Sequence, residues 1–477
     1  MSTKFVDALL ATLPGTVVST DAGLINRACM DWRKRYQSTA LAVVSPTSVE
    51  QVRTLVRLCK AHDVAITTQG GNTGLVGGSV PMAASGEKTR PEVVLRTSRL
   101  REVLSLDESN LSLTASAGYT LSEVQEYAAA QGYLFPLSLA SEGSCTLGGN
   151  LASNAGGVAV LRYGNARELC LGVEYVNAEG ELCGDLRGLR KNNTGYDLRH
   201  LLIGSEGTLG VITTACMKVF PAPRSKVVAW LNVRDINSAV DCLNGLQQRL
   251  LHALSSYEWM NAEAIDLVQA QFSLKAPQGP SGCDHVLAEF TSAAPQATLD
   301  AEVQEALEAL TEQVNGLYNV TLARNQREQG QLWALRENIS EAQAKTGLNV
   351  KHDVACAVSR LPDFHGRALA AIAEAGIEVR PVLFGHLGDG NLHFNLSAPA
   401  GADPASFLAS HQSHLNDLVH GAIVACGGTV SAEHGIGQLK AELLREITPG
   451  ANYQAMLAIK AALDPAGLFN PGKLLVR

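Results

Sequence analysis

The sequence has few charged residues and no long apolar run, and both absences exclude classes of protein. Only 18% of the 477 residues are charged and 46% are hydrophobic, the balance of a large globular enzyme. The net charge of −8 argues against a nucleic-acid-binding surface and predicts a soluble protein. No apolar run reaches the roughly 18 residues of a membrane span. Residues 1–15 are predicted to form a short amphipathic helix rather than a signal peptide, because Asp7 interrupts their apolar residues.

The chain also lacks paired-cysteine motifs. Its ten cysteines are scattered, with no Cys-x-x-Cys pair and no regular spacing. In a chain of this length, that pattern indicates reduced thiols rather than a disulfide framework. We therefore expect a cytoplasmic protein.

Two or three domains are expected, because 477 residues exceed what one hydrophobic core usually supports. The proline-containing segment 220–226 marks a boundary. Before it, short apolar runs alternate with helical patterns, as in residues 48–71, which predict a helix followed by a strand. After it, strands and helices alternate, and this order predicts an antiparallel sheet covered by helices. The predicted strands and helices are 227–233, 236–254, 285–292 and 301–314, in that order. The fold class is therefore α+β.

Two segments are dense in glycine. "QGGNTGLVGGS" (69–79, the first glycine loop) has five glycines in eleven residues and directly follows the predicted strand. "CTLGGNLASNAGG" (145–157, the second glycine loop) has four in thirteen. Either loop alone is more often an ordinary tight turn. Two such loops without charged residues favour a diphosphate, because glycine lets backbone N–H groups close on phosphate oxygens.

The usual nucleotide motifs are absent. No glycines have the G-x-G-x-x-G spacing of a Rossmann fingerprint, which disfavours an ordinary nicotinamide enzyme. "GLFNPGKL" (467–474) fits G-x-x-x-x-G-K, but Leu474 stands where a P-loop needs Ser or Thr. Pro471 lies inside that loop, and too little chain follows for a helix. A P-loop is therefore rejected.

A histidine pair flanks a turn in "GHLGDGNLHFN" (385–395). Its Gly, Asp and Asn residues predict a loop that enters a short strand. Imidazoles suit zinc and other first-row metals, although such a pair alone is more often structural. "SAEHGIG" (431–437) adds Glu433 and His434. Adjacent residues of an extended segment point in opposite directions, so these two can serve different centres.

Long motifs resemble a known superfamily. Residues 70–81, 145–157, 161–182, 191–213 and 464–475 resemble the FAD-binding domain of the vanillyl-alcohol oxidase (p-cresol methylhydroxylase-type) flavoproteins. Residues 332–342, 350–354, 385–395 and 431–437 resemble its FAD-linked D-2-hydroxyacid dehydrogenases, a branch that contains D-lactate and D-2-hydroxyglutarate dehydrogenases. The resemblance runs from about residue 40 to residue 473.

The resemblance implies an FAD domain of two α/β subdomains (1–222), a substrate domain (223–428) and a C-terminal segment (429–477) that returns to the FAD domain. The FAD is expected to be non-covalent, because the first glycine loop contains no histidine. The diphosphate would contact Gly70, Gly71, Asn72, Thr73 and Gly74, with Ser79 nearby. The ribityl and isoalloxazine region would meet Cys145, Thr146, Gly149, Asn150 and Ser153. The adenine side or ring edge would meet Gly207, Gly210, Val211 and Ile212, and Asn470 and Lys473 would lie near the cofactor.

By the same resemblance, His386, His393 and Glu433 would bind a divalent metal, with zinc as the first choice. Three protein ligands with open positions are typical of a catalytic metal. The substrate hydroxyl and carboxylate would chelate it, His434 would take the hydroxyl proton, and C2 would give a hydride to flavin N5.

The implied substrate contacts are Arg336, Ser340, Lys351, Asn395 and His434. Arg336 and Ser340 are four residues apart on a predicted helix and would share a face. Lys351 belongs to a predicted alternating strand.

Two buried cations with a small hydroxyl favour D-2-hydroxyglutarate, oxidised to 2-oxoglutarate. D-lactate, D-malate and other D-2-hydroxyacids stay open, as do a non-catalytic flavin protein and a hydrolytic metalloenzyme. The resemblance suggests a flavoprotein or quinone as electron acceptor. The oligomeric state is open, with a homodimer among the alternatives.

Overall fold

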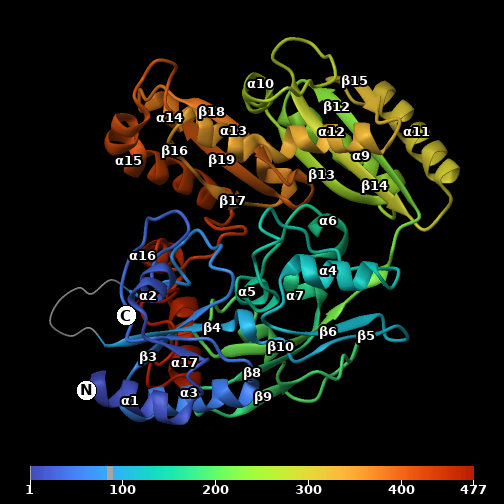
Figure 1. The fold of residues 1–477 in the computed structure, drawn as a ribbon. Helices are drawn as coiled ribbons and strands as arrows, with labels where there is room; N and C mark the ends of the chain where they lie inside the picture. Colours follow the sequence, from blue (N-terminus) through green and yellow to red (C-terminus); the bar gives the residue numbers. More distant parts are fainter. Residues whose placement is uncertain (1, 83–89, 477) are drawn as a thin grey trace. The chain divides into compact units, whose positions relative to one another are not determined.

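The structure is a computed structural model that describes residues 2–82 and 90–476, and the chain divides into two compact units (Figure 1). Unit 1 contains Met1–Gly156, Gly164–Pro221 and Glu433–Arg477. Unit 2 contains Gly157–Tyr163 and Ala222–Ala432. Unit 1 ends at Pro221, whereas the expected FAD domain ended at residue 222. Unit 1 resumes at Glu433, whereas the expected C-terminal segment began at residue 429.

The first sheet of unit 1 is partly parallel. Its order is β1 (Val18–Ser19), β2 (Val43–Val44), β4 (Glu92–Arg96) and β3 (Ala65–Gln69). Strands β2 and β3 run parallel to β4, while β1 is antiparallel to β2. Helix α3 (Val49–His62) begins after Ser48, whose side chain accepts from the Gln51 N–H, and it buries Val52, Leu55, Val56 and Cys59 at helical spacing. The predicted helix and strand in residues 48–71 are confirmed.

The C-terminal segment extends this first sheet. The Ile66 N–H donates to the Leu468 carbonyl over 2.8 Å, and the Asn470 N–H donates to the Ile66 carbonyl over 2.9 Å. Figure 1 shows the red C-terminal segment beside the blue N-terminal strands. Residues 468–470 therefore lie next to β3, just before the first glycine loop.

The second sheet of unit 1 is antiparallel and holds the second glycine loop through a helix. Its order is β5 (Leu104–Asp107), β6 (Ser112–Ser116), β10 (Val211–Lys218), β8 (Cys170–Val176) and β9 (Leu182–Asp185). Helix α5 (Leu147–Ala152) contacts β10, and Thr146 caps it by accepting from the Gly149 N–H. The second glycine loop is therefore partly helical.

Unit 1 contains further short elements. They are α1 (Ser2–Thr12), α2 (Ala22–Ala28), η1 (Thr97–Arg99), α4 (Leu121–Ala129), β7 (Tyr133–Leu134), α7 (Ala166–Leu169), α8 (Arg199–Leu202), β11 (Phe220–Pro221), α16 (Ala441–Ile447) and α17 (Gly450–Leu463). Strands β7 and β11 pair with each other. The N-terminal helix predicted from the sequence is present as α1.

Unit 2 is built on an antiparallel sheet of eight strands. Its order is β15 (Leu317–Leu322), β12 (Ser225–Val233), β14 (Asp284–Ser292), β13 (Leu254–Met260), β18 (Arg380–Gly385), β19 (Asn391–Ser397) and β16 (Asn349–Val350), and β17 (Asp353–Ala355) also pairs with β19. The strands predicted at 227–233 and 285–292 are confirmed as β12 and β14. Strand β13 was not predicted from the sequence.

Helices cover this sheet, as expected. Helix α9 (Ile236–Leu250) contacts β13, and both α11 (Gln296–Gln313) and α12 (Gln326–Glu337) contact β12. The remaining elements are α6 (Val160–Tyr163), α10 (Ala262–Gln271), α13 (Ile339–Thr346), η2 (Val358–Arg360), α14 (Leu361–Glu374), η3 (Leu387–Asp389) and α15 (Pro404–Ala425). The predicted α+β class is confirmed. Across residues 2–82 and 90–476, no helix is long and apolar enough to cross a membrane.

Candidate cofactor and active site

Both glycine loops line one cavity of unit 1, the glycine-loop cavity, which encloses about 950 Å³ including space open to solvent. Every cofactor contact expected from the sequence lines it except Val211 and Lys473. The lining also includes residues that were not expected to meet the cofactor: Thr68, Val76, Gly78, Thr97, Gly148, Ala152, Ser205, Glu206 and His434.

The first glycine loop closely approaches residues 144–146, where the second loop begins. A Cβ on Gly71 would lie 2.0 Å from the Ser144 carbonyl oxygen, and a Cβ on Gly70 would lie 2.4 Å from Thr146 Oγ1. Only glycine allows such an approach. A Cβ on Gly74 would meet nothing within 4 Å, although Gly74 lines the cavity. The first glycine loop therefore packs against the second while leaving space at Gly74.

Side chains fix the shape of the first glycine loop. Asn72 has a left-handed backbone with φ 56°, which asparagine tolerates better than most residues. Its Nδ2 donates to the Met30 carbonyl over 2.9 Å, and its Oδ1 accepts from Ser79 Oγ over 2.7 Å. Ser79 thus supports the loop from within.

The cavity wall offers unused polar atoms. The buried Oγ1 of Thr68 and Nδ2 of Asn150 make no hydrogen bond within the residues that the structure describes. Buried polar atoms are nearly always paired, so a ligand with polar groups suits this wall. Asn470 is already engaged, since its Oδ1 accepts from the Thr68 N–H over 3.0 Å.

Val211 and Lys473 lie elsewhere in unit 1. Val211 is buried in the apolar core around β3 and β4. The Lys473 ammonium donates to Thr67 Oγ1 over 2.9 Å, and that hydroxyl donates to Glu92 Oε2 over 2.6 Å. Burial lowers the pKa of Lys473 to about 8, against the opposing effect of Glu92 and Glu206. Lys473 therefore has buried partners within the protein.

Glu206 is a cavity residue that the sequence analysis missed. It has a φ of 51°, which is strained for a residue with a side chain. Its carboxylate accepts from the Ile436 and Gly437 N–H groups, each over 2.7 Å. Burial raises the pKa of Glu206 despite these two bonds. Glu206 thereby holds the loop that carries His434 at the cavity wall.

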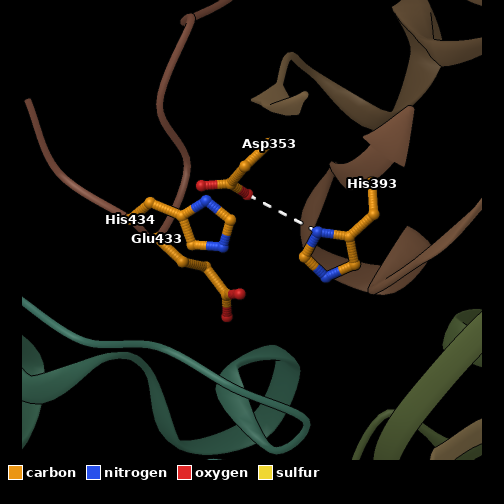
Figure 2. Close-up of side chains that lie close together, drawn as sticks. All are labelled: Asp353, His393, Glu433 and His434. Atoms are coloured by element: carbon orange, nitrogen blue, oxygen red, sulfur yellow. Dashed lines mark ion pairs between the residues drawn. The ribbon is translucent and has the colours of Figure 1, made fainter. Parts of the chain in front are cut away.

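Four side chains can offer metal-ligating atoms that all lie within 4.8 Å of one another: Asp353, His393, Glu433 and His434, the ligand cluster (Figure 2). Strand pairing sets Asp353 directly opposite His393, with Oδ1 and Nδ1 3.8 Å apart. Glu433 follows Ala432, whose N–H donates to the Asp353 carbonyl over 3.3 Å. Chain continuity therefore brings the Glu433–His434 pair to β17. Asp353 was not among the expected ligands, although it lies in the motif "VKHDV".

The loop of the histidine pair has the expected form, with η3 followed by β19. Gly390 has φ 89°, and a Cβ there would lie 2.1 Å from the Cys356 carbonyl oxygen, so the turn requires glycine. Next in the chain, the Asn391 amide donates to Asp353 Oδ1 over 3.0 Å. Asn391, His393 and Asn395 alternate along β19 and so share a face. The Asn395 amide donates to Gln343 Oε1 over 2.8 Å.

His386 lies beside His393 but outside the ligand cluster. The two ring centroids are 5.9 Å apart. His386 Nδ1 is 2.7 Å from Glu258 Oε1, and Arg336 Nε donates to Glu258 Oε2 over 2.8 Å. Burial opposes ionisation of Glu258, but the charges of His386 and Arg336 prevail and lower its pKa to about 2. Glu258 was not predicted from the sequence.

The expectation that Arg336 and Ser340 share one helical face is wrong. Helix α12 ends at Glu337 and α13 begins at Ile339, with Asn338 between them. The Asn338 Nδ2 donates to the Ala334 carbonyl over 2.7 Å, a local bond that competes with helix continuation. Arg336 is consequently buried and Ser340 exposed.

Lys351 is exposed, contrary to the expectation of a second buried cation. The expected continuous strand is interrupted, because Lys351 and His352 lie between β16 and β17. His352 is the buried residue of the pair. Its Nδ1 lies 2.8 Å from the Phe394 carbonyl oxygen and its Nε2 3.0 Å from Asn416 Oδ1.

Two family descriptions match the chain: FAD linked oxidases, C-terminal domain, over residues 222–474, and FAD binding domain over residues 40–184. The mitochondrial D-2-hydroxyglutarate dehydrogenase of Bos taurus is 37% identical over 471 residues, covering 98% of this chain and 82% of the relative. The D-2-hydroxyglutarate dehydrogenase of Xanthomonas citri pv. viticola is 35% identical over 467 residues, covering 98% of this chain and 96% of the relative.

Solved structures share the fold at lower identity. p-Cresol methylhydroxylase with substrate bound has a TM-score of 0.74 at 17% identity, with 99% of this chain and 96% of that chain covered. An alkyldihydroxyacetonephosphate synthase has a TM-score of 0.71 at 17% identity, with 98% and 84% covered. The family resemblance expected from the sequence is confirmed. The chain belongs to the FAD linked oxidases and to the family of the D-2-hydroxyglutarate dehydrogenases, and it is an oxidoreductase.

Proposed function

We propose that the protein oxidises D-2-hydroxyglutarate to 2-oxoglutarate in an FAD-dependent, metal-assisted reaction. The proposal rests mainly on His434, because this residue lines the glycine-loop cavity and also belongs to the ligand cluster. Relatives that match nearly the full chain bear the name of this activity.

The glycine-loop cavity fits a non-covalent FAD. Gly70, Gly71 and Gly74 would hold the diphosphate, and the unused Thr68 Oγ1 and Asn150 Nδ2 would bond to polar groups of the cofactor. When bound, FAD supplies N5 as the acceptor of the hydride that leaves C2. Because the first glycine loop has no histidine, we expect the cofactor to dissociate on denaturation.

The donor set fits a divalent cation of the zinc type, which prefers imidazole and carboxylate ligands. His386, His393 and Glu433 are the proposed ligands, and Asp353 is a further candidate because it belongs to the ligand cluster. A bound cation would supply Lewis acidity to the substrate hydroxyl. His434 would take the hydroxyl proton, a role that suits an imidazole.

Arg336 is the proposed partner of a substrate carboxylate. Its Nε is engaged with Glu258, and a guanidinium carries further N–H donors for a carboxylate. Ser340, Lys351 and Asn395 remain proposed substrate contacts. We also propose a cytoplasmic location and a flavoprotein or quinone as electron acceptor.

The test is anaerobic flavin reduction. The purified protein, with its flavin bound, is mixed with D-2-hydroxyglutarate, L-2-hydroxyglutarate, D-malate or D-lactate, and the flavin absorbance is followed. We expect the fastest bleaching with D-2-hydroxyglutarate and none with the L-isomer. Faster bleaching by D-lactate would overturn the substrate assignment, and no bleaching by any D-2-hydroxyacid would overturn the function.

A further inference from the structure

We infer that Glu258 is the positioning residue of the active centre in unit 2, with one carboxylate oxygen orienting His386 and the other orienting Arg336. The inference rests on the proposed function, in which His386 binds a metal and Arg336 binds a substrate carboxylate. Glu258 would touch neither directly and would act through both of them.

Glu258 joins three separate elements. It lies on β13, His386 directly follows β18, and Arg336 lies in α12. The antiparallel register pairs Trp259 with Gly385 and so brings Glu258 opposite His386. The distances are 2.7 Å from Oε1 to His386 Nδ1 and 2.8 Å from Oε2 to Arg336 Nε. Each carboxylate oxygen thus has its own partner.

Burial of the Glu258 carboxylate costs free energy that stability of the fold alone does not explain. Glu258 is 0% exposed, and its chain neighbours Tyr257 and Trp259 are buried as well. A buried ion pair contributes little net stability, and a well-packed apolar group of similar volume often serves as well. A need of the fold therefore gives little reason for a charge at this position. Its two partners, which are both proposed active-site residues, supply a reason.

The contact with Glu258 determines the tautomer of His386. One oxygen of the Glu258 carboxylate accepts from Arg336 Nε, and the other can accept a hydrogen bond from the His386 imidazole. The Nδ1 of His386 must then carry the hydrogen. A neutral imidazole with Nδ1–H has its lone pair on Nε2, the form that binds a metal. Glu258 would therefore prepare Nε2 of His386 as a ligand atom.

The same carboxylate also orients Arg336. Holding Nε leaves the terminal guanidinium nitrogens for other acceptors. The Phe384 ring supports the guanidinium from one side, at 4.8 Å between Cζ and the ring centroid. Phe384 also pairs with His393 across β18 and β19. A change at Glu258 is therefore expected to weaken metal binding and substrate binding together.

The test compares Glu258→Gln with Glu289→Gln. Glutamine keeps the shape of Glu258, but it loses the charge and presents an amide N–H group to one of two donors. Glu289 is the matched control on neighbouring β14, where it bonds to Lys226 Nζ and Trp333 Nε1, each over 3.0 Å. Metal affinity is measured by chelator competition, together with KM for D-2-hydroxyglutarate, flavin content and thermal unfolding.

For Glu258→Gln we expect metal affinity to fall about ten- to a hundredfold, the usual effect of losing a carboxylate behind a ligating histidine. KM should rise in parallel, flavin content should stay at the wild-type level, and Glu289→Gln should change neither metal affinity nor KM. Wild-type metal affinity and KM in folded Glu258→Gln would overturn the inference. A wild type that binds no metal and oxidises no D-2-hydroxyacid would instead overturn the proposed function.

A second measurement does not depend on folding of the variant. In metal-free wild type with ¹⁵N-labelled histidine, the His386 imidazole should show a protonated Nδ1 and an unprotonated Nε2. The opposite tautomer would overturn the inference.

Discussion

Unit 1 forms its site mainly from backbone, whereas unit 2 forms its site from buried charged side chains. In unit 1 the two glycine loops meet where a single Cβ on Gly71 would lie 2.0 Å from a carbonyl oxygen. In unit 2 the fully buried Glu258 contacts both His386 and Arg336. A site made of backbone is sensitive to added atoms, and a site made of charges is sensitive to lost ones.

The largest effect is expected from loss of a metal ligand in unit 2. His393→Ala should reduce turnover to background, because His393 is a proposed ligand and stands opposite Asp353. The flavin spectrum should stay nearly unchanged, since the glycine-loop cavity does not include His393. Steady-state turnover and the absorbance spectrum check both statements.

The proposed metal ligands should also act together, so that the effects of losing them do not add. His386→Ala and Glu433→Ala should each resemble His393→Ala, and the double variant should be little worse than either single one. Activity losses that multiplied would indicate separate roles. Full activity after verified metal removal would contradict a catalytic metal.

In unit 1, loss of the cofactor is expected from an added side chain. Gly74→Val should lower FAD content severely and leave the fold intact, because a Cβ at Gly74 meets only open space in the cavity wall. Gly15→Val is the control, since Gly15 is exposed and its Cβ would also meet nothing within 4 Å. The measurements are FAD per chain and the far-UV circular dichroism spectrum. Unchanged FAD content in Gly74→Val would remove the first glycine loop from the cofactor site.

Within unit 2, burial separates two proposed substrate cations. Arg336→Met should lower kcat/KM for D-2-hydroxyglutarate by a factor of about 30 to 160, the effect of losing a charged hydrogen bond of about 2–3 kcal/mol. Lys351→Met should cost less, because Lys351 is exposed and solvent screens its charge. If Lys351 meets the distal carboxylate, its loss should spare D-lactate. An equal loss for both substrates would assign Lys351 to the shared carboxylate or to the fold.

The same contrast explains what the sequence could predict. Glycine density indicated the cavity, because close backbone approach requires glycine within each local loop. Nothing local marks Glu258, which lies in the buried stretch "LSSYEWM" of β13 and whose partners are 78 and 128 positions away in sequence. The spacing of Arg336 and Ser340 gave a wrong prediction. The spacing rule assumes a continuous helix, and the Asn338 side chain interrupts this one.

Lys473 is a buried charged side chain of unit 1, beside Thr67 and Glu92, and its expected effect is on stability alone. Its pKa of about 8 lies below the roughly 10.4 of an unfolded lysine. Between these values the unfolded chain binds more protons than the folded one, so stability should rise with pH across that window. Below pH 8 both states are protonated, and burial of the charge is unfavourable.

Lys473→Met removes the titration of Lys473. The titration of all other groups cancels when the unfolding free energies of the two proteins are compared. The difference in unfolding free energy between wild type and Lys473→Met should shift in favour of wild type by up to about 3 kcal/mol from pH 8 to above pH 10. Urea unfolding of the flavin-free proteins at several pH values measures it. Parallel curves for the two proteins would show that Lys473 keeps an ordinary pKa in the folded state. The buried charge would then be fully compensated by Thr67 and Glu92, and unit 1 would resemble unit 2 in this one place.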